Sequence, residues 1–304
     1  MDFLKYRYIF LIFSLVIIIG GITYGVITDY KFDIDFKGGT KIEIDLKENF
    51  DNNEVQNIVS TVTGQKPLVQ KMSSGESTVA ITSEVMNEEV SNKVMEALKE
   101  KYVNMAEPSI RNIQPSYGKE LLESALLAVS VAVIIILLYI TIRFKVLGFT
   151  AAITATLSLV HDALFIIAIY GIFKLPINTS FVAVILTIIG YSINDTIIIY
   201  DRIRENKRKV VKSPDEKDTI NLSINQTIKR TIYTSLTTII VIVVVYIFAL
   251  LNNQQVLKEF SLPLILGVLV GTYSSIFIAS SSWYMLDQVV AKITGNKKTN
   301  KKKK

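Results

Sequence analysis

Residues 190–206 read GYSINDTIIIYDRIREN, and this stretch is mostly apolar until charges return at Asp201. The apolar run begins near residue 177, so it is long enough for a helix to cross a hydrocarbon core of about 30 Å. Asn194 and Asp195 lie side by side within it, where an unpaired carboxylate costs at least ~2.5–3.5 kcal/mol. The stretch therefore predicts a transmembrane helix that carries a functional carboxylate.

Five more runs of this kind occur in the 304-residue chain, half of which is hydrophobic. A soluble domain would not contain six. We therefore predict a polytopic α-helical membrane protein, with one transmembrane helix in residues 1–28 and a five-helix membrane domain in residues 119–288. The helices predicted for that domain, with a cytoplasmic loop at 201–228, are 119–142, 147–172, 177–200, 229–251 and 260–287.

The distribution of charge predicts the orientation, because membrane loops rich in Lys and Arg stay in the cytoplasm. Basic residues precede the first run and fill the turn between the second and third. Residues 201–230 hold nine basic and five acidic residues, whereas residues 29–118 hold ten basic and fifteen acidic residues. Six crossings with both termini in the cytoplasm fit this pattern and place residues 29–118 outside.

The two ends of the chain are expected to contact the membrane in different ways. The first run could be a cleaved signal peptide, but it is too long for a typical h-region and no Ala-x-Ala-like site follows. We expect an uncleaved anchor. The basic tail, residues 289–304, is interpreted as a disordered cytoplasmic anchor to anionic lipids of the bilayer.

Residues 29–118 are enough for one small extracytoplasmic domain. The alternation in FDIDFKGGTKIEIDL (32–46) is typical of a half-buried strand, with Gly38-Gly39 as a kink or hairpin turn. Apolar spacing predicts helices at 52–63 and 86–101. Short strand candidates complete an order ββαββαβ; they lie at 67–71, 77–82 and 109–114. We predict an α+β, ferredoxin-like domain with its helices on one face of an antiparallel sheet.

The composition argues against several classes of function. The chain has no Cys and one His, so we expect no disulfide, no thiol chemistry and no zinc site. The P-loop pattern is absent around Gly38-Gly39, and no nucleophile–base pair stands out. The net charge of +6 reflects membrane orientation rather than nucleic-acid binding. We expect neither an enzyme nor a cofactor.

The fourth run carries a polar face. Thr187, Tyr191 and Asp195 follow i, i+4, i+8 spacing and share one side of the helix, with Asn194 beside them. This face must meet protein or water rather than lipid. Gly190 would let the helix bend or let a neighbour approach closely. The alternative is a structural Asp that caps a break in the helix.

The third run has a matching stripe. Thr154, Ser158 and Asp162 repeat the same spacing, and His161 is adjacent to Asp162. Asp162 and His161 are therefore candidates for a second polar site. A satisfied structural pair is the competing interpretation.

The last two runs add a cation and a ridge of small residues. Arg230 opens the fifth run, where it either acts on a buried carboxylate or simply snorkels to the interface. In the sixth run, every fourth residue over four positions is small, which predicts close packing against another helix. The ridge consists of Gly267, Gly271, Ser275 and Ala279.

Together these groups suggest ion-coupled conformational work. Burial raises the pKa of a carboxyl group and a nearby Arg lowers it, so moving the Arg would switch proton affinity. A proton crossing the membrane supplies about 2.3 kcal/mol per 100 mV. A carboxylate with hydroxyl and amide neighbours suits Na⁺ as well as H⁺, so the ion stays open.

At this point GYSINDTIIIYDRIREN resembles the fourth-span signature of the SecF family of bacterial protein translocase subunits. Three other stretches are similar to family segments, and the resemblance covers essentially the whole chain. They are FDIDFKGGT (32–40), LVHDALF (159–165) and INQTIKRTIYTSLTT (224–238).

The resemblance implies a multi-pass protein of the bacterial cytoplasmic membrane, similar to half of a resistance-nodulation-division (RND) transporter. It implies SecD as the partner, association with the SecYEG channel and YajC, and exported unfolded polypeptides as substrate. It further implies use of the proton motive force, with Asp195 and Arg230 in proton passage. Two alternatives remain: an RND-type half-transporter of a small molecule or lipid, and a structural scaffold that conducts no protons.

Overall fold

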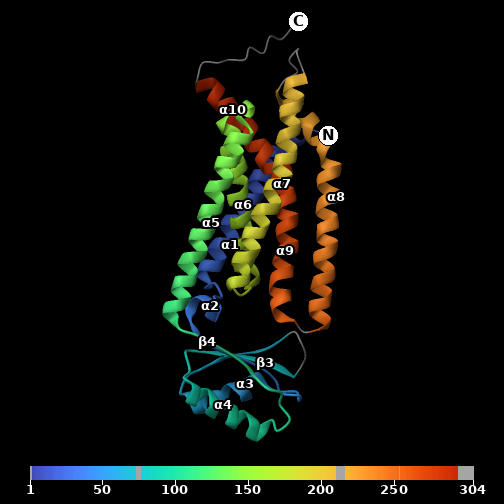
Figure 1. The fold of residues 1–304 in the computed structure, drawn as a ribbon. Helices are drawn as coiled ribbons and strands as arrows, with labels where there is room; N and C mark the ends of the chain where they lie inside the picture. The colour runs from blue at the N-terminus through green and yellow to red at the C-terminus, as the bar shows by residue number, and fades with distance from the viewer. Residues whose placement is uncertain (1, 73–76, 210–215, 253, 294–304) are drawn as a thin grey trace.

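The computed structural model describes residues 2–72, 77–209, 216–252 and 254–293. Long helices run side by side in one bundle, and a small sheet with two helices lies beyond one end of it (Figure 1). We call that end of the bundle the domain-side end. The chain enters the small domain after its first long helix and returns to the bundle through α5. The chain thus folds as a helical bundle with one small domain between α1 and α5.

Six helical segments of the described residues are long and apolar enough to cross a membrane. The sixth is interrupted by a π-helical turn, Ser275–Ala279. The segments are α1 (Arg7–Ile27, preceded by the 3₁₀ turn Phe3–Tyr6), α5 (Pro115–Arg143), α6 (Phe149–Phe173), α7 (Thr179–Lys209), α8 (Glu216–Leu251), and α9 (Gln255–Ser274) with α10 (Ser280–Ile293).

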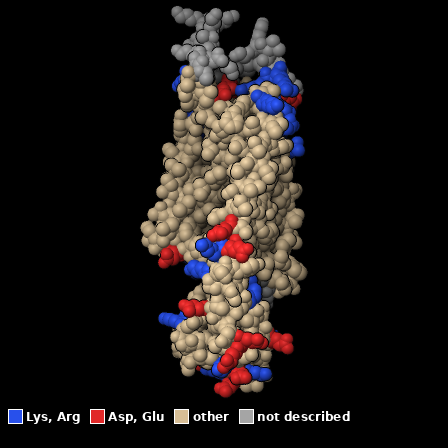
Figure 2. Space-filling model, turned by 60° about the vertical axis from the view of Figure 1, so that its left-hand side comes forward, with Lys and Arg blue, Asp and Glu red and all other residues tan. Residues whose placement is uncertain are grey.

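The surface agrees with a bilayer around the bundle. In Figure 2, charged side chains gather at the two ends of the molecule, and the face between them is almost free of Lys, Arg, Asp and Glu. The middle of that face is therefore suited to lipid.

The predicted loop at 201–228 is wrong at both ends. α7 continues to Lys209 and α8 begins at Glu216, so only residues 210–215 fall outside the described helices. Arg, Glu and Lys are strong helix formers and extend the apolar helices beyond the membrane. The extensions also contact each other, since Asn206 Nδ2 donates to Ser223 Oγ over 2.9 Å. Of the predicted basic tail, residues 289–293 belong to α10 and the rest lies outside the described residues.

The small domain has the element order βαββαβ. Its strands are β1 (Gly39–Asp45), β2 (Leu68–Lys71), β3 (Thr78–Ser83) and β4 (Ser109–Ile113), and its helices are α3 (Asn52–Thr63) and α4 (Glu88–Lys101). The sheet order is β2-β3-β1-β4, with antiparallel neighbours throughout. Both helices lie on one face of the sheet (Figure 1). Their apolar sides bury Val55, Val59, Val94 and Leu98 against β1 and β3.

The first predicted strand is wrong over its first half. Residues Ile34–Lys37 form one helical turn, α2, and β1 starts only at Gly39. The Asp33 carboxylate caps this turn by accepting from Ile34 N. Gly38 and Gly39 then adopt φ angles of +73° and +139°, which glycine tolerates best. The alternation of apolar and polar residues there reflects contacts with the bundle, where Phe32 forms a single β-bridge with Ile177.

Candidate functional site

The ridge of small residues in the sixth span lies directly on α7. A Cβ built on Gly267 would come within 2.0 Å of Ile188, and one built on Gly271 within 3.0 Å of Ser192. One turn further, Ser275 Oγ lies 3.0 Å from Thr196 Oγ1. Any larger side chain on the ridge would push the two helices apart. This close contact brings the hydroxyls of the two helices together in the middle of the bundle.

The π-helical turn begins where the ridge meets α7. It places two consecutive hydroxyls, Ser274 and Ser275, into the bundle interior, and both are fully buried. Ser275 Oγ donates to the Ser192 carbonyl oxygen at 3.1 Å, while Ser274 Oγ reaches α6. A regular α-helix separates consecutive side chains by about 100°. The two consecutive serines, at the end of α9 and the start of the turn, therefore bond to two neighbouring helices.

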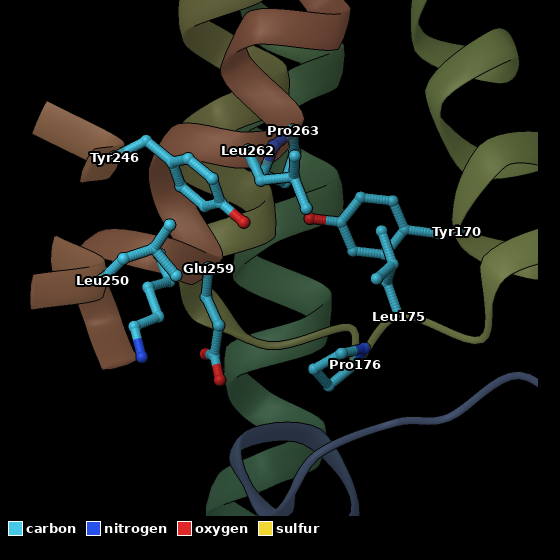
Figure 3. Close-up of a pocket in the computed structure, with 9 residues that line it drawn as sticks. Tyr170, Leu175, Pro176, Tyr246, Leu250, Glu259, Leu262 and Pro263 are labelled. Atoms are coloured by element: carbon cyan, nitrogen blue, oxygen red, sulfur yellow. The ribbon is translucent and has the colours of Figure 1, made fainter. Parts of the chain in front are cut away.

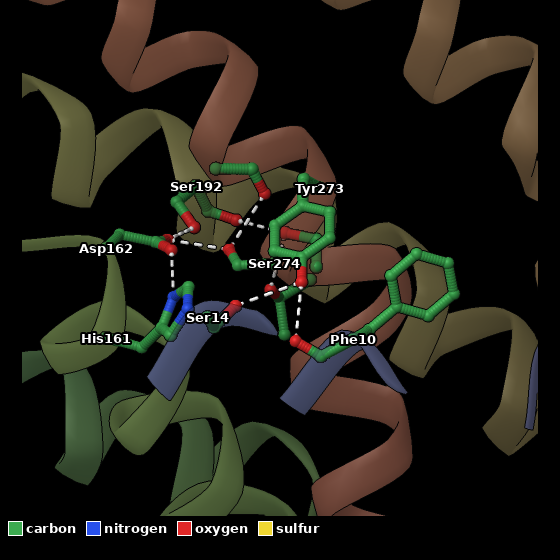
Figure 4. A network of polar contacts seen from close by, with 10 residues as sticks. Phe10, Ser14, His161, Asp162, Ser192, Tyr273 and Ser274 are labelled. Carbon is green, nitrogen blue, oxygen red and sulfur yellow. Dashed lines mark hydrogen bonds and ion pairs between the residues drawn. The ribbon is translucent and has the colours of Figure 1, made fainter. Parts of the chain in front are cut away.

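Asp162 on α6 is the centre of a polar network (Figure 4). Its Oδ2 accepts hydrogen bonds from Ser192 Oγ at 2.5 Å and Ser274 Oγ at 2.8 Å, and its Oδ1 lies 2.9 Å from His161 Nδ1. Asp162 is completely buried, and so are Thr154 and Ser158 of the predicted stripe. The carboxylate thus has partners from three helices, as a buried charge requires.

The surroundings of this network include the first helix. Tyr273 Oη donates to the Phe10 carbonyl oxygen at 2.8 Å and lies 2.9 Å from Ser14 Oγ, which joins the sixth span to α1. The His161 ring packs near Tyr273 (centroids 6.4 Å apart), and its Nε2 has no hydrogen-bond partner. The network therefore connects four helices of the bundle.

Asp195 on α7 has the opposite environment. It is 0% exposed, yet neither carboxylate oxygen has a hydrogen-bond partner. The polar groups that act on it come from α8, namely the Ser235 hydroxyl and the Arg230 charge, and neither completes a hydrogen bond to it. Buried carboxylates without partners are rare in folded proteins and call for an explanation. This carboxylate is the strongest candidate functional group in the bundle.

The other residues predicted around Asp195 are spread over two sides of α7 and onto α8. Tyr191 is half-buried, and its hydroxyl lies 3.3 Å from Thr238 Oγ1 of α8. Asn194 is exposed and points away from the carboxylate site. Arg230 is also exposed, and it makes no ion pair within the described part of the chain. Of the residues predicted to act with Asp195 in proton passage, only Arg230 acts on the carboxylate, and it does so from beyond ion-pair distance.

Gly190 does not pack against a neighbour within this chain. A Cβ there would meet nothing within 4 Å, and α7 runs through this position without a break. Gly190 and Asn194 lie instead on an exposed stripe of α7. The stripe follows helical spacing and consists of Ala183, Thr187, Gly190 and Asn194.

Sequence reasoning missed the serines that surround Asp162. Ser192 sits two residues from Gly190, on another face of α7, and Ser274 falls outside the fourfold ridge. The sequence shows these hydroxyls within apolar helices, but it does not show that the helices bring them to Asp162. Among the described residues, no three His, Asp or Glu side chains gather as metal ligands would.

The small domain contacts α7 directly. Asp35 of α2 is buried, and its Oδ2 accepts from Thr179 N at 2.9 Å and from Thr179 Oγ1 at 2.8 Å. Asp35 thus caps the first turn of α7 from another element, where a carboxylate also meets the positive end of the helix dipole. The backbone adds Asp33 N to the Ile177 carbonyl at 3.0 Å. The helix that carries Asp195 is therefore attached at its end to the entrance of the domain.

Comparisons with known proteins agree with this architecture. The family model of the protein export membrane protein SecD/SecF, C-terminal, matches residues 93–289. The protein translocase subunit SecF of Borreliella burgdorferi is 36% identical over 291 residues, covering 92% of this chain and 95% of the relative. SecDF of Bacillus subtilis is 37% identical over 286 residues, which span 93% of this chain but 37% of that longer protein.

A solved structure shows the same arrangement. The crystal structure of SecDF, a translocon-associated membrane protein from Thermus thermophilus, superimposes with a TM-score of 0.83 at 27% sequence identity. The match covers 95% of this chain and 39% of the solved one. The chain is thus similar to nearly all of SecF proteins and to just over a third of SecDF proteins.

Proposed function

The chain belongs to the SecD/SecF family of protein export membrane proteins, and on that premise we propose that it acts as a SecF-type subunit of the Sec translocase. In this proposal it works with SecD and uses the proton motive force to assist late steps of protein export across the bacterial cytoplasmic membrane. It performs ion-coupled mechanical work rather than an enzymatic reaction, and needs no cofactor.

The observation that carries the proposal is the unpartnered carboxylate of Asp195. An ionised carboxylate without partners is strongly disfavoured inside a low-dielectric bundle. The same group is acceptable when it is protonated or when a cation approaches it. Arg230 acts on it across the α7–α8 contact from beyond ion-pair distance. A small movement of α8 against α7 would then bind or release a proton at Asp195.

In this proposal, movement of the bundle reaches the exported polypeptide through the domain-side end of α7. Thr179 at that end is held by Asp35, which belongs to the entrance of the small domain. A shift of α7 would therefore move the entrance of the domain directly, because the two are joined by these hydrogen bonds. We place the domain, as a ferredoxin-like unit, on the outer side of the membrane, where it would contact unfolded polypeptides. Both termini then lie in the cytoplasm, as the basic residues favour.

The partner is proposed to cover the exposed stripe of α7. A stripe of small and polar side chains in a membrane helix favours close packing with another helix over contact with lipid. The SecDF relatives are more than twice as long as this chain, and we propose that a second chain supplies the equivalent of the remainder. SecD is the candidate, and SecYEG and YajC would associate with the pair.

A scaffold that conducts no protons is the competing function, and one observation favours it. The Asp162 network shows that a carboxylate in this bundle can be fully satisfied and serve only to join helices. Asp195 could likewise receive its partner from SecD. If Asp195 carries protons, loss of its charge abolishes export and leaves the complex intact. If Asp195 only joins the two chains, the same change dissociates the complex.

The deciding experiment is export of a secreted reporter by cells carrying Asp195→Asn, with co-purification of SecD measured in parallel. We expect export that depends on the proton gradient to be lost while the complex stays intact. Asp201→Asn is the matched control, because Asp201 lies on the same helix but in surface ion pairs with Arg143 (2.9 Å) and Arg204 (2.7 Å).

Normal export by an intact Asp195→Asn complex would rule out proton binding and release at Asp195 as the driving step. Loss of the complex would assign Asp195 to assembly instead. Repeating the assay with a Na⁺ gradient in place of a proton gradient identifies the coupling ion.

A further inference from the structure

A cavity of about 200 Å³ opens at the domain-side end of the bundle, away from both carboxylate sites. It lies between α6, α8 and α9, with Pro176 from the α6–α7 connection on one side (Figure 3). Its walls combine apolar side chains, such as Leu250 and Pro176, with four polar ones. The polar residues are Tyr170, Tyr246, Lys258 and Glu259.

Lys258 is the unusual member of this set. Its side chain lines the cavity and the residue is 7% exposed, yet its ammonium has no hydrogen-bond partner. It makes no ion pair with Glu259, because neighbouring residues of a helix point about 100° apart. A buried ammonium without a counter-charge is costly, and truly buried lysines are paired. Among the described residues, no group that lines the cavity pairs with the Lys258 ammonium.

Further hydrogen-bonding groups line the same cavity. The hydroxyls of Tyr170 and Tyr246 point toward each other across it in Figure 3, and neither is bonded to another described residue. Each can donate one hydrogen bond to an oxygen atom. Glu259 also lines the cavity and accepts a hydrogen bond from Asn178 Nδ2. A carboxylate oxygen can accept more than one hydrogen bond.

The cavity is bordered by surface that faces lipid. Ile172 and Phe173 flank it on α6, and Leu250 and Leu251 flank it on α8; the four are between 39% and 78% exposed. Apolar side chains this exposed at the end of a membrane helix lie beside acyl chains. A membrane lipid can therefore reach the cavity without crossing water.

We propose that this cavity binds the head group of an ethanolamine phospholipid. The phosphodiester faces the Lys258 ammonium and the two tyrosine hydroxyls, the primary amine of the head group faces Glu259, and the acyl chains follow the exposed surface of α8. The neighbouring opposite charges of Lys258 and Glu259 match the two charges of that head group. A glycerol head group would place neutral hydroxyls, and no cation, against Glu259, and a choline amine has no N–H to donate.

The test measures lipid retention by native mass spectrometry on the full-length chain purified in detergent. Dioleoyl phospholipids with ethanolamine, choline or glycerol head groups are added at equal concentration. We expect one ethanolamine lipid to be retained about tenfold better than the other two, which corresponds to about 1.4 kcal/mol. Lys258→Met should lower retention of all three lipids, and Glu259→Gln should remove the preference for ethanolamine over choline.

Thermal unfolding supplies a second measurement that does not depend on retention. Without lipid, Lys258→Met should unfold at a higher temperature than the parent chain, because it removes the unpaired charge and keeps the packing. Ethanolamine lipid should then raise the unfolding temperature of the parent chain but not of the variant. The matched controls are Lys119→Met and Glu123→Gln, a lysine and a glutamate on α5 that are both well exposed.

Several results would overturn the assignment. Equal retention of the three lipids by the parent chain would do so, as would unchanged retention in Lys258→Met. Displacement of the lipid by an acidic apolar peptide at low concentration would identify the cavity as a peptide site. If Lys258→Met fails to fold, Tyr246→Phe carries the test, and undiminished retention of the ethanolamine lipid in that variant would contradict the proposal.

Discussion

Ser192 Oγ and Asp162 Oδ2 lie 2.5 Å apart and join α7 to α6 at the most buried level of the bundle. Ser192 also faces Gly271 of the sixth span, so it sits where three helices meet. Asp195, one turn further along α7, has no such partner. One helix therefore supplies a structural hydroxyl to one carboxylate and carries a second, unsatisfied carboxylate itself.

Ser192→Ala should destabilise the protein by about 1–3 kcal/mol, because it removes a donor from a buried charged acceptor. The change is readily measured as a lower midpoint of thermal unfolding in detergent. Thr187→Ala is the control, since Thr187 is exposed on the same helix and bonds only to the Ala183 carbonyl. An unchanged midpoint for Ser192→Ala would mean that Ser274 and His161 alone satisfy Asp162.

Gly267→Ala and Gly190→Ala should have opposite effects. At Gly267 the added methyl group would overlap Ile188, and overpacking of this kind costs about 1–3 kcal/mol. At Gly190 the methyl group meets no neighbour, so the better helix propensity of Ala should add up to ~1 kcal/mol. Both are checked by thermal unfolding of the purified chain. In the complex with SecD, Gly190→Ala should instead weaken association if the partner covers the exposed stripe.

Asp35→Ala should loosen the attachment of the small domain to α7. The residue accepts from the Thr179 amide and adds to the cap that Asn178 Oδ1 forms with Phe181 N, and loss of a capping contact costs about 0.5–2 kcal/mol. We expect faster hydrogen exchange at the Thr179 amide and in the first turn of α7, with the α3 amides unchanged. Asp51→Ala, which removes the cap of α3 inside the domain, should give the reverse pattern. Equal protection of α7 in both variants would show that Asp35 does not hold the helix.

The N-terminal turn should open in acid. A hydrogen bond from Lys217 lowers the pKa of Asp2, with Asn221 contributing a second bond. Because the folded pKa lies below the unfolded value, the stabilisation is complete above the usual Asp range and is lost as the pH falls through the folded pKa. The amides of Phe3 and Leu4, which donate to Asn221 Oδ1, report the opening by hydrogen exchange.

Asp2→Asn should remove this pH dependence and leave the same amides equally exposed near neutral pH and in acid. A pH dependence that survives the substitution would assign the titration to another group.

Much of the fold follows from local sequence properties. Six apolar runs set the number of spans, and their length is a physical requirement of the bilayer. Fourfold spacing placed Thr154, Ser158 and Asp162 on one buried face, because helical geometry alone decides which residues share a side. The segments where prediction failed, 32–37 and 201–228, are those whose conformation depends on contacts with other elements or on charged residues with high helix propensity.

The candidate site shows the limit of such reasoning. Asp162 and Asp195 follow identical i, i+4, i+8 patterns, and this spacing by itself does not distinguish them. Their difference arises from which side chains the neighbouring helices deliver: Ser192 and Ser274 reach Asp162, and no described side chain completes a hydrogen bond to Asp195. The sequence by itself determined that two carboxylates would lie in the membrane. Only the tertiary structure decided which one is satisfied, because hydrogen bonding depends on the positions of atoms far apart in the chain.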